Sequence, residues 1–152
     1  MGGHDWRRSL RTVPAIYEMS SGIAIAPALA RMGLPHHSLV AWQRADDLFI
    51  ALHQLSREFP AIERFELASQ LRRSAFSVPV NIVEGFGRLP GKDRLHYLQI
   101  GSASLAEVGY CLHVARRLEY IDALRYKQLE LKVRQVAAPL RGLMKSERNI
   151  RL

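Results

Sequence analysis

The last quarter of the chain carries an apolar row whose spacing leaves little choice of fold. Its members recur at steps of four, three, four and three residues, and are Leu129, Val133, Val136, Leu140 and Leu143. This spacing places the five side chains on one face of an α-helix, and partner helices must cover that face. An earlier row of inward positions has similar helical spacing, and consists of Ala41, Ala45, Leu48, Leu52 and Leu55. The two rows together predict a helical bundle.

Helical signals dominate from Ser38 onward, and the alternation typical of strands is essentially absent. The first, third and fourth helices are expected to be capped by Ser38, Asp93 and Asp122. Because the connections between successive helices are short, neighbouring helices are expected to be antiparallel. The predicted fold class is therefore all-α, an antiparallel up-down-up-down four-helix bundle over residues 38–152. Residues 1–37 are predicted to be a poorly structured N-terminal arm.

The second expected helix, within residues 65–88, combines an apolar face with a row of polar side chains. We call this set the polar row: Gln70, Arg73, Ser77, Asn81, Glu84 and Arg88. If the polar row is exposed, it is a solvated surface. If it faces another helix or subunit, its hydrogen bonds and ion pairs fix the register of packing. Pro79 favours the second interpretation, because a kink there re-aims Asn81 and Glu84.

The chain is basic, with 22 Lys and Arg residues against 14 Asp and Glu residues and a net charge of +8. The excess is not confined to the arm, since residues 38–152 hold 18 basic and 12 acidic residues. A basic folded body is typical of a protein with a polyanionic partner. Ordinary solubilising charge is the alternative interpretation.

The basic residues of the fourth expected helix lie on the face that points away from its apolar row. We call this set the basic row: Lys127, Arg134, Arg141, Lys145 and Arg148. Arg116 and Arg117, late on the third helix, are candidates to extend it. A rigid row of cations can follow a phosphate backbone, and each neutralised phosphate steepens the salt dependence of binding. Solvated helix faces usually mix charges of both signs, so these residues are predicted to bind nucleic acid.

No motif for catalysis, metal binding or cofactor binding stands out in the sequence. A ferritin-like metal site needs Glu-x-x-His pairs, and the nearest pattern runs from Asp93 to His96. The single cysteine, Cys111, excludes an internal disulfide and lies in an apolar stretch, as expected for a buried thiol in a reducing cytosol. No apolar stretch approaches the length of a membrane span. We expect a cytoplasmic protein that is not an enzyme and that uses no metal, cofactor or membrane.

Several segments resemble one bacterial family of four-helix bundles, which is encoded in intervening sequences of 23S ribosomal RNA genes. The most specific segments lie in the second expected helix, and are SQLRRSA at residues 69–75 and SVPVNIVEGFGR at residues 77–88. The segments VAWQRA at residues 40–45 and ARRLEYI at residues 115–121 also resemble the family. The resemblance covers about residues 39–145. It departs from the family at Ala103 and Glu119, where glycine is common.

The resemblance implies a homopentamer of bundles with a basic surface and no enzymatic activity. A related branch, the accessory variability determinants of diversity-generating retroelements, is similar in fold, and its members bind a reverse transcriptase and nucleic acid. Two functions therefore stay open. The leading hypothesis is an oligomeric bundle that binds the backbone of RNA or DNA. The alternative is a protein-interaction scaffold, or an accessory subunit of a reverse transcriptase, whose charge is incidental.

Overall fold

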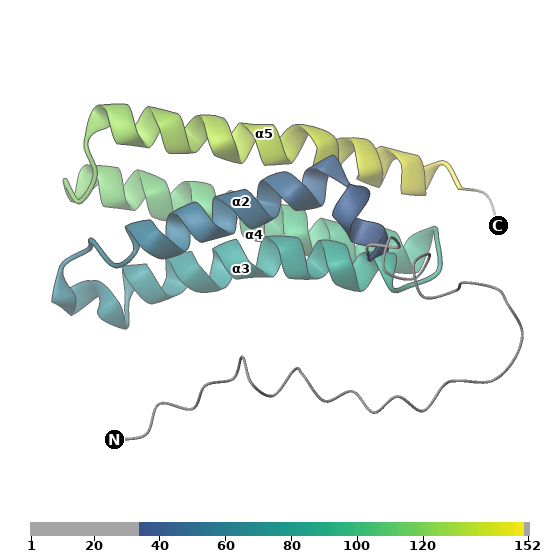
Figure 1. The fold of residues 1–152 in the computed structure, drawn as a ribbon, viewed down its shortest axis with the longest axis horizontal. Helices are drawn as coiled ribbons and strands as arrows, with labels where there is room; N and C mark the ends of the chain where they lie inside the picture. Colours follow the sequence, from purple (N-terminus) through teal and green to yellow (C-terminus); the bar gives the residue numbers. More distant parts are fainter. Residues whose placement is uncertain (1–33, 151–152) are drawn as a thin grey trace, which may run out of the picture. The chain divides into compact units, whose positions relative to one another are not determined.

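Helices dominate the part of the chain that the computed structural model describes, residues 34–150 (Figure 1). Four of them are α-helices and two are short 3-10 helices, and no strand occurs within this range. In chain order the elements are η2 (Pro35–Ser38), α2 (Val40–Leu55), η3 (Ala61–Arg64), α3 (Leu67–Phe86), α4 (Lys92–Arg117) and α5 (Ala123–Arg148). The predicted all-α class and the four helices are confirmed.

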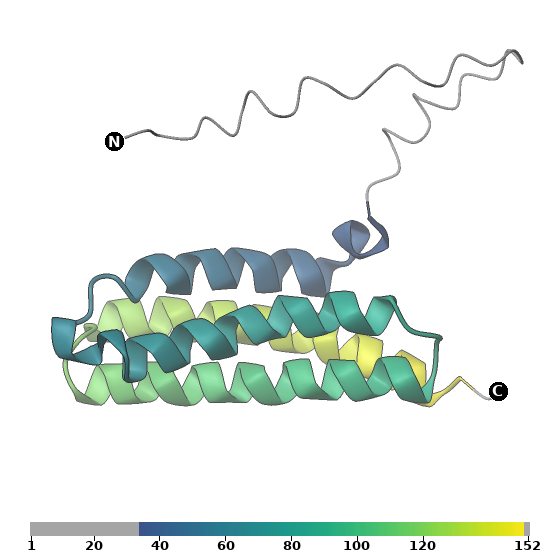
Figure 2. The same cartoon turned by 90° about the horizontal axis from the view of Figure 1, so that it is seen from below.

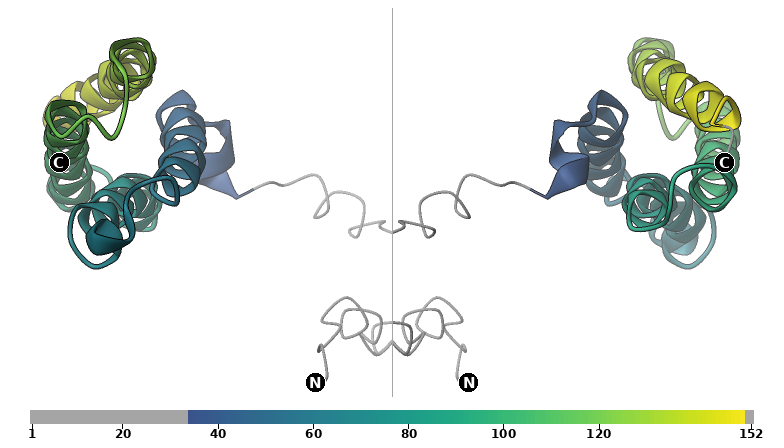
Figure 3. Two further views of the ribbon diagram at one scale, coloured as in Figure 1. Left: turned by 90° about the vertical axis from the view of Figure 1, so that its left-hand side faces the viewer. Right: turned by 90° about the vertical axis from the view of Figure 1, so that its right-hand side faces the viewer.

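The four α-helices lie side by side, and each packs on its neighbours in the chain, while α2 also packs on α5 (Figure 3). The connections from α2 to α3 and from α4 to α5 lie at one end of this group. The connection from α3 to α4 lies at the other end (Figures 1 and 2). This packing is compatible with a helical bundle. None of the helices described is both long enough and apolar enough to cross a membrane.

The apolar rows predicted from spacing form the core between the helices. All five inward positions of α2 are buried. On α5, Leu129, Val136 and Leu140 are buried, while Val133 and Leu143 are partly buried and pack against the same core. The helix α3 contributes its own face and continues through Pro79, as α5 continues through Pro139.

One predicted helix cap is confirmed, because the side chain of Asp122 accepts a hydrogen bond from the backbone N–H of Arg125 at 2.7 Å. The prediction for Ser38 is wrong. Ser38 ends η2, where its hydroxyl donates to the carbonyl of Pro35 at 3.0 Å, and α2 follows Leu39 without a side-chain cap. Residues 1–33 of the predicted arm lie outside the described residues.

The prediction that Asp93 caps the third helix is also wrong, because α4 begins at Lys92, the residue before Asp93. The capping position belongs to Gly91, whose φ of 99° is a conformation that residues with a side chain rarely adopt. Asp93 falls instead in the first turn of α4, where a negative charge still complements the helix dipole.

Candidate nucleic-acid interface

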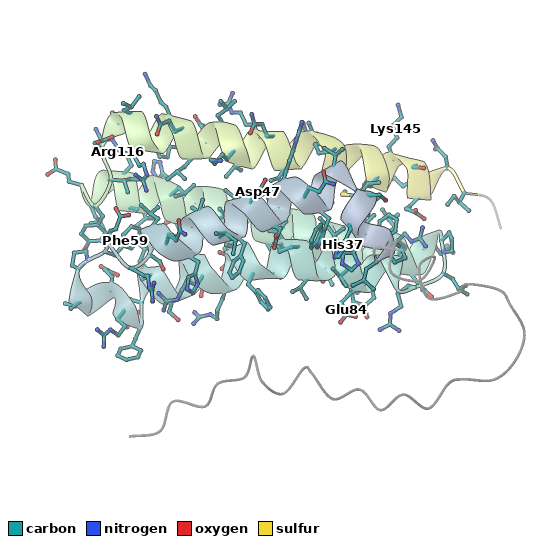
Figure 4. The ribbon with its side chains drawn as sticks, in the orientation of Figure 1. His37, Asp47, Phe59, Glu84, Arg116 and Lys145 are labelled. Carbon is teal, nitrogen blue, oxygen red and sulfur yellow. The ribbon has the colours of Figure 1, made fainter. Side chains whose placement is uncertain are left out.

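The structure places all five side chains of the basic row on the exposed surface of α5. The row extends from Lys127 to Arg148, which at the rise of an α-helix is about 32 Å. Figure 4 shows Lys145 projecting from α5 on the side away from the other helices, whereas Glu84 projects from α3 on the opposite side. These two residues, one from each row, therefore lie on different faces.

The charges of the basic row are largely uncompensated. Within residues 34–150, one member forms an ion pair: Arg134 Nη2 lies 3.2 Å from Glu130 Oε1, one helical turn earlier. The two side chains are 72% and 42% exposed, so this pair is weak and easily exchanged for another anion. The other four members have no carboxylate within 4.0 Å among the described side chains. The surface of α5 can therefore offer its charge to a partner.

Arg116 and Arg117 lie in the last turn of α4, where the helix dipole favours cations. Arg116 is partly buried and Arg117 is exposed. Figure 4 places Arg116 at the end of the bundle where α5 begins, far from Lys145. The two arginines can therefore extend the basic row only at its N-terminal end.

Half of the polar row of α3 connects to α4. The Gln70 amide donates to Glu107, and the Ser104 hydroxyl donates to Ser77 Oγ at 2.9 Å. Arg88 Nη2 donates to the hydroxyl of Tyr97 at 3.0 Å. The first two bonds join side chains of the packed helices α3 and α4, as expected for contacts that fix their register. The third joins the residues that follow α3 to α4.

The other half makes local contacts, within α3 or with the residues that directly follow it. Arg73 donates to Ser69 Oγ at 2.6 Å, and Asn81 Nδ2 donates to the carbonyl of Ser77 at 2.8 Å. Glu84 lies 3.7 Å from Arg88 in an exposed ion pair. The expected helix-to-helix contacts therefore come from other members of the row than Arg73, Asn81 and Glu84.

Sequence reasoning missed a buried ion pair at the end of the bundle where α3 meets α4. Arg94 Nη1 of α4 lies 3.2 Å from Glu147 Oε1 of α5, and the two side chains are 16% and 7% exposed. A signal for it exists in the sequence. Glu147 follows Leu143 by four residues and so continues the apolar row of α5 with an acid, which needs a buried partner.

No cluster suited to a metal occurs among the described side chains, since no three His, Cys, Asp or Glu residues there are grouped to hold one. Cys111 is buried, at 3% exposure. Burial raises the pKa of its thiol, and the nearby Glu107 carboxylate raises it further. This environment is that of a structural cysteine rather than a reactive one.

These features define a class: a basic, all-α protein of four packed helices with one charged outer face. The 23S rRNA-intervening sequence protein family matches residues 37–142. This match spans well over half of the chain, and the chain belongs to that family. The resemblance inferred from the segments of α3 is thereby confirmed.

A solved structure shares the fold. It is the 1.70 Å crystal structure of a protein of unknown function from the S23 ribosomal protein family of Bacteroides thetaiotaomicron VPI-5482. The TM-score is 0.65 at 21% identity, over 70% of this chain and 96% of that one. At this identity the likeness concerns the fold alone. No curated protein matches the chain.

Proposed function

We propose that this protein is a cytoplasmic, non-enzymatic bundle of antiparallel helices that assembles as a homo-oligomer, a pentamer, and binds the backbone of RNA or DNA through the basic row. The observation that carries the proposal is the row itself, with five exposed cations of which four lack a carboxylate within 4.0 Å among the described residues. The alternating ends at which successive helices connect support the antiparallel order.

The chemistry of the row favours contact with phosphates rather than with bases. Its members are Lys and Arg side chains spaced by one or two helical turns, with no aromatic side chain among them on which a base could stack. Contacts of this kind position a protein on a nucleic acid without reading its sequence. We therefore expect binding that tolerates changes of sequence and weakens steeply with salt.

An electrophoretic mobility shift with structured RNA, run over a series of salt concentrations, tests this function. The double variant Arg134→Glu/Arg141→Glu should weaken binding by at least about tenfold, because it removes two phosphate contacts and adds two repulsive charges. Both residues are exposed, so the variant should fold like the wild type. The proposal would be contradicted if the RNA affinity of the wild type did not change with salt, or if the variant bound RNA as tightly as the wild type.

The second candidate function, a scaffold or an accessory subunit such as one for a reverse transcriptase, rests on a different surface. An apolar groove of about 260 Å³ lies between α2 and α3, and its lining includes Trp42, Phe49, Phe76 and Val83. Phe76 is 54% exposed there, and exposed aromatic side chains in a groove are typical of protein contacts.

The variant Phe76→Ser should then weaken assembly or partner binding while leaving RNA affinity unchanged. Light scattering measures assembly, and a monomer mass at micromolar concentration would contradict the oligomer.

A further inference from the structure

A second basic feature lies at the turn between α2 and α3, and no member of the basic row belongs to it. A pocket of about 400 Å³ opens there, and its polar lining consists of Ser56 and the three arginines Arg57, Arg64 and Arg72. We infer that this pocket binds a phosphate group. The inference concerns a separate site and does not depend on the function proposed for α5.

One of the three arginines is held in place by the fold. Arg72 Nη1 donates to the hydroxyl of Ser56 at 3.2 Å, and Arg72 Nη2 donates to the carbonyl of Arg64 at 3.1 Å. These bonds use two of the five N–H donors of the guanidinium, so its remaining donors are available to an anion. Ser56 is itself buried, and its hydroxyl donates to the carbonyl of His53 at 2.8 Å. The pocket thus has a prearranged cation beside it.

The other two arginines supply charge that nothing nearby neutralises. Arg57 and Arg64 are exposed and form no ion pair with a carboxylate in residues 34–150. No acidic residue lines the pocket. Three arginines in the lining, with no acid among them, therefore leave an excess of positive charge at this turn.

The acids closest along the chain are directed elsewhere. Glu58 lies 3.6 Å from Arg125 of α5. Glu63 accepts a hydrogen bond from the hydroxyl of Tyr120 at 2.8 Å and another from the backbone N–H of Leu67 at 3.1 Å. The partners of both carboxylates therefore lie outside the pocket. A third acid, Glu66, is exposed and does not line it.

The chemistry of the pocket suits a phosphate better than a carboxylate or a neutral ligand. Guanidinium groups bind phosphate oxygens through paired hydrogen bonds, and three of them match a group that carries up to two negative charges. The volume lies within the range of small-ligand sites, and the buried ring of Phe59 gives the pocket an apolar wall. Figure 4 shows Phe59 at the same end of the bundle as Arg116 and far from Lys145. The phosphate can belong to a polynucleotide or be free.

Arginine side-chain NMR signals of the full chain, recorded during titration with inorganic phosphate at constant ionic strength, test this inference. We expect a saturable shift of a few Nε–Hε signals in the wild type. The variant Arg57→Gln/Arg64→Gln should reduce the affinity at least about tenfold, because two charge-assisted contacts are lost. Ala61→Glu, which places a carboxylate at the pocket, should do the same. The matched control Arg134→Gln, on the basic row, should leave phosphate binding unchanged.

A second titration, with a short single-stranded oligoribonucleotide that lacks terminal phosphates, identifies the source of the phosphate. Shifts of the same signals, lost in Arg57→Gln/Arg64→Gln, assign the pocket to polynucleotide phosphates. Shifts with inorganic phosphate alone assign it to free phosphate. The inference is overturned if inorganic phosphate gives no saturable shift, or if both pocket variants bind it as the wild type does. Neither result tests the function proposed for the basic row. That function would be contradicted if the Arg134→Glu/Arg141→Glu variant bound RNA as well as the wild type does.

Discussion

Glu147 of α5 and Arg94 of α4 form a buried ion pair that joins three helices at one end of the bundle. The second carboxylate oxygen of Glu147 accepts the backbone N–H of Gly91 at 2.7 Å. Arg94 in turn donates to the carbonyl of Gly85, the penultimate residue of α3, at 3.3 Å and to that of Arg88 at 3.1 Å. The carboxylate thus supplies the counter-charge of a largely buried guanidinium and the acceptor for a buried backbone N–H group.

Replacement of Glu147 by alanine should lower the free energy of unfolding by about 3 kcal/mol, because Arg94 is then left partly buried without its counter-charge. Urea denaturation followed by circular dichroism measures the change. The matched control is Glu130→Ala on the same helix, which removes an exposed pair and should cost no more than about 0.5 kcal/mol. Equal effects of the two substitutions would contradict a structural role for the buried pair.

Replacement of Glu119 by glycine should stabilise the protein by about 1 kcal/mol. Glu119 has a φ of 61°, the left-handed region, where residues with a side chain are strained. It follows α4 in a Schellman motif, in which the N–H of Tyr120 reaches the carbonyl of Ala115 at 2.9 Å.

Thermal or urea unfolding measures this gain. The control Glu119→Ala removes the same side chain but keeps a Cβ, so it should leave the stability nearly unchanged. If alanine stabilises as much as glycine, the gain comes from loss of the carboxylate and not from relief of the backbone.

The phenol of Tyr120 should have a pKa above the usual value for a tyrosine. The hydrogen bond that it donates to Glu63 raises the pKa of its phenol above the usual 10.0, with smaller contributions from burial and from the Glu63 charge. The stabilisation from this bond is therefore complete below pH 10.0 and is lost as the pH rises through the raised pKa. Tyrosine ring carbon signals in NMR follow the titration, with Tyr120→Phe to assign the signal. A Tyr120 signal that titrates at or below the usual pH would refute this.

Cys111 should react slowly with thiol reagents while the protein is folded. Its side chain is buried, and the raised pKa leaves little of the reactive thiolate at neutral pH. The rate of reaction with an aromatic disulfide, measured in buffer and again in denaturing urea, checks the prediction. Rates that agree in the two solutions would show that the thiol is accessible in the native state.

The helices were predictable because their apolar spacing directly reflects the burial that forms them. The five inward positions of α2 and the row of α5 are examples. Side chains three or four residues apart share one face of a helix, and one face of each of these helices packs against the core. The prediction failed where a local choice depends on backbone geometry. Ser38 and Asp93 are good capping residues, but Ser38 belongs to η2. Gly91 takes the capping position of α4, two residues before Asp93.

The candidate site was predictable in part, for a related reason. An outward-facing row such as the one from Lys127 to Arg148 can be read from helical spacing alone. Contacts between helices cannot, because they depend on which residues the packed helices bring together. The pairing of Ser77 with Ser104, and that of Arg94 with Glu147, joins residues 27 and 53 positions apart.

The central claim is that the basic row binds phosphates, and the salt dependence of RNA affinity tests it most directly. Fluorescence anisotropy of a labelled RNA over a salt series gives the slope of log K against log salt. For five contacts the slope should be roughly −3.5 to −4.5, and Arg141→Gln should make it shallower by about 1. Lys132→Gln, an exposed control on α5 outside the row, should leave it unchanged. A slope near zero, or the same loss from both substitutions, would contradict the account.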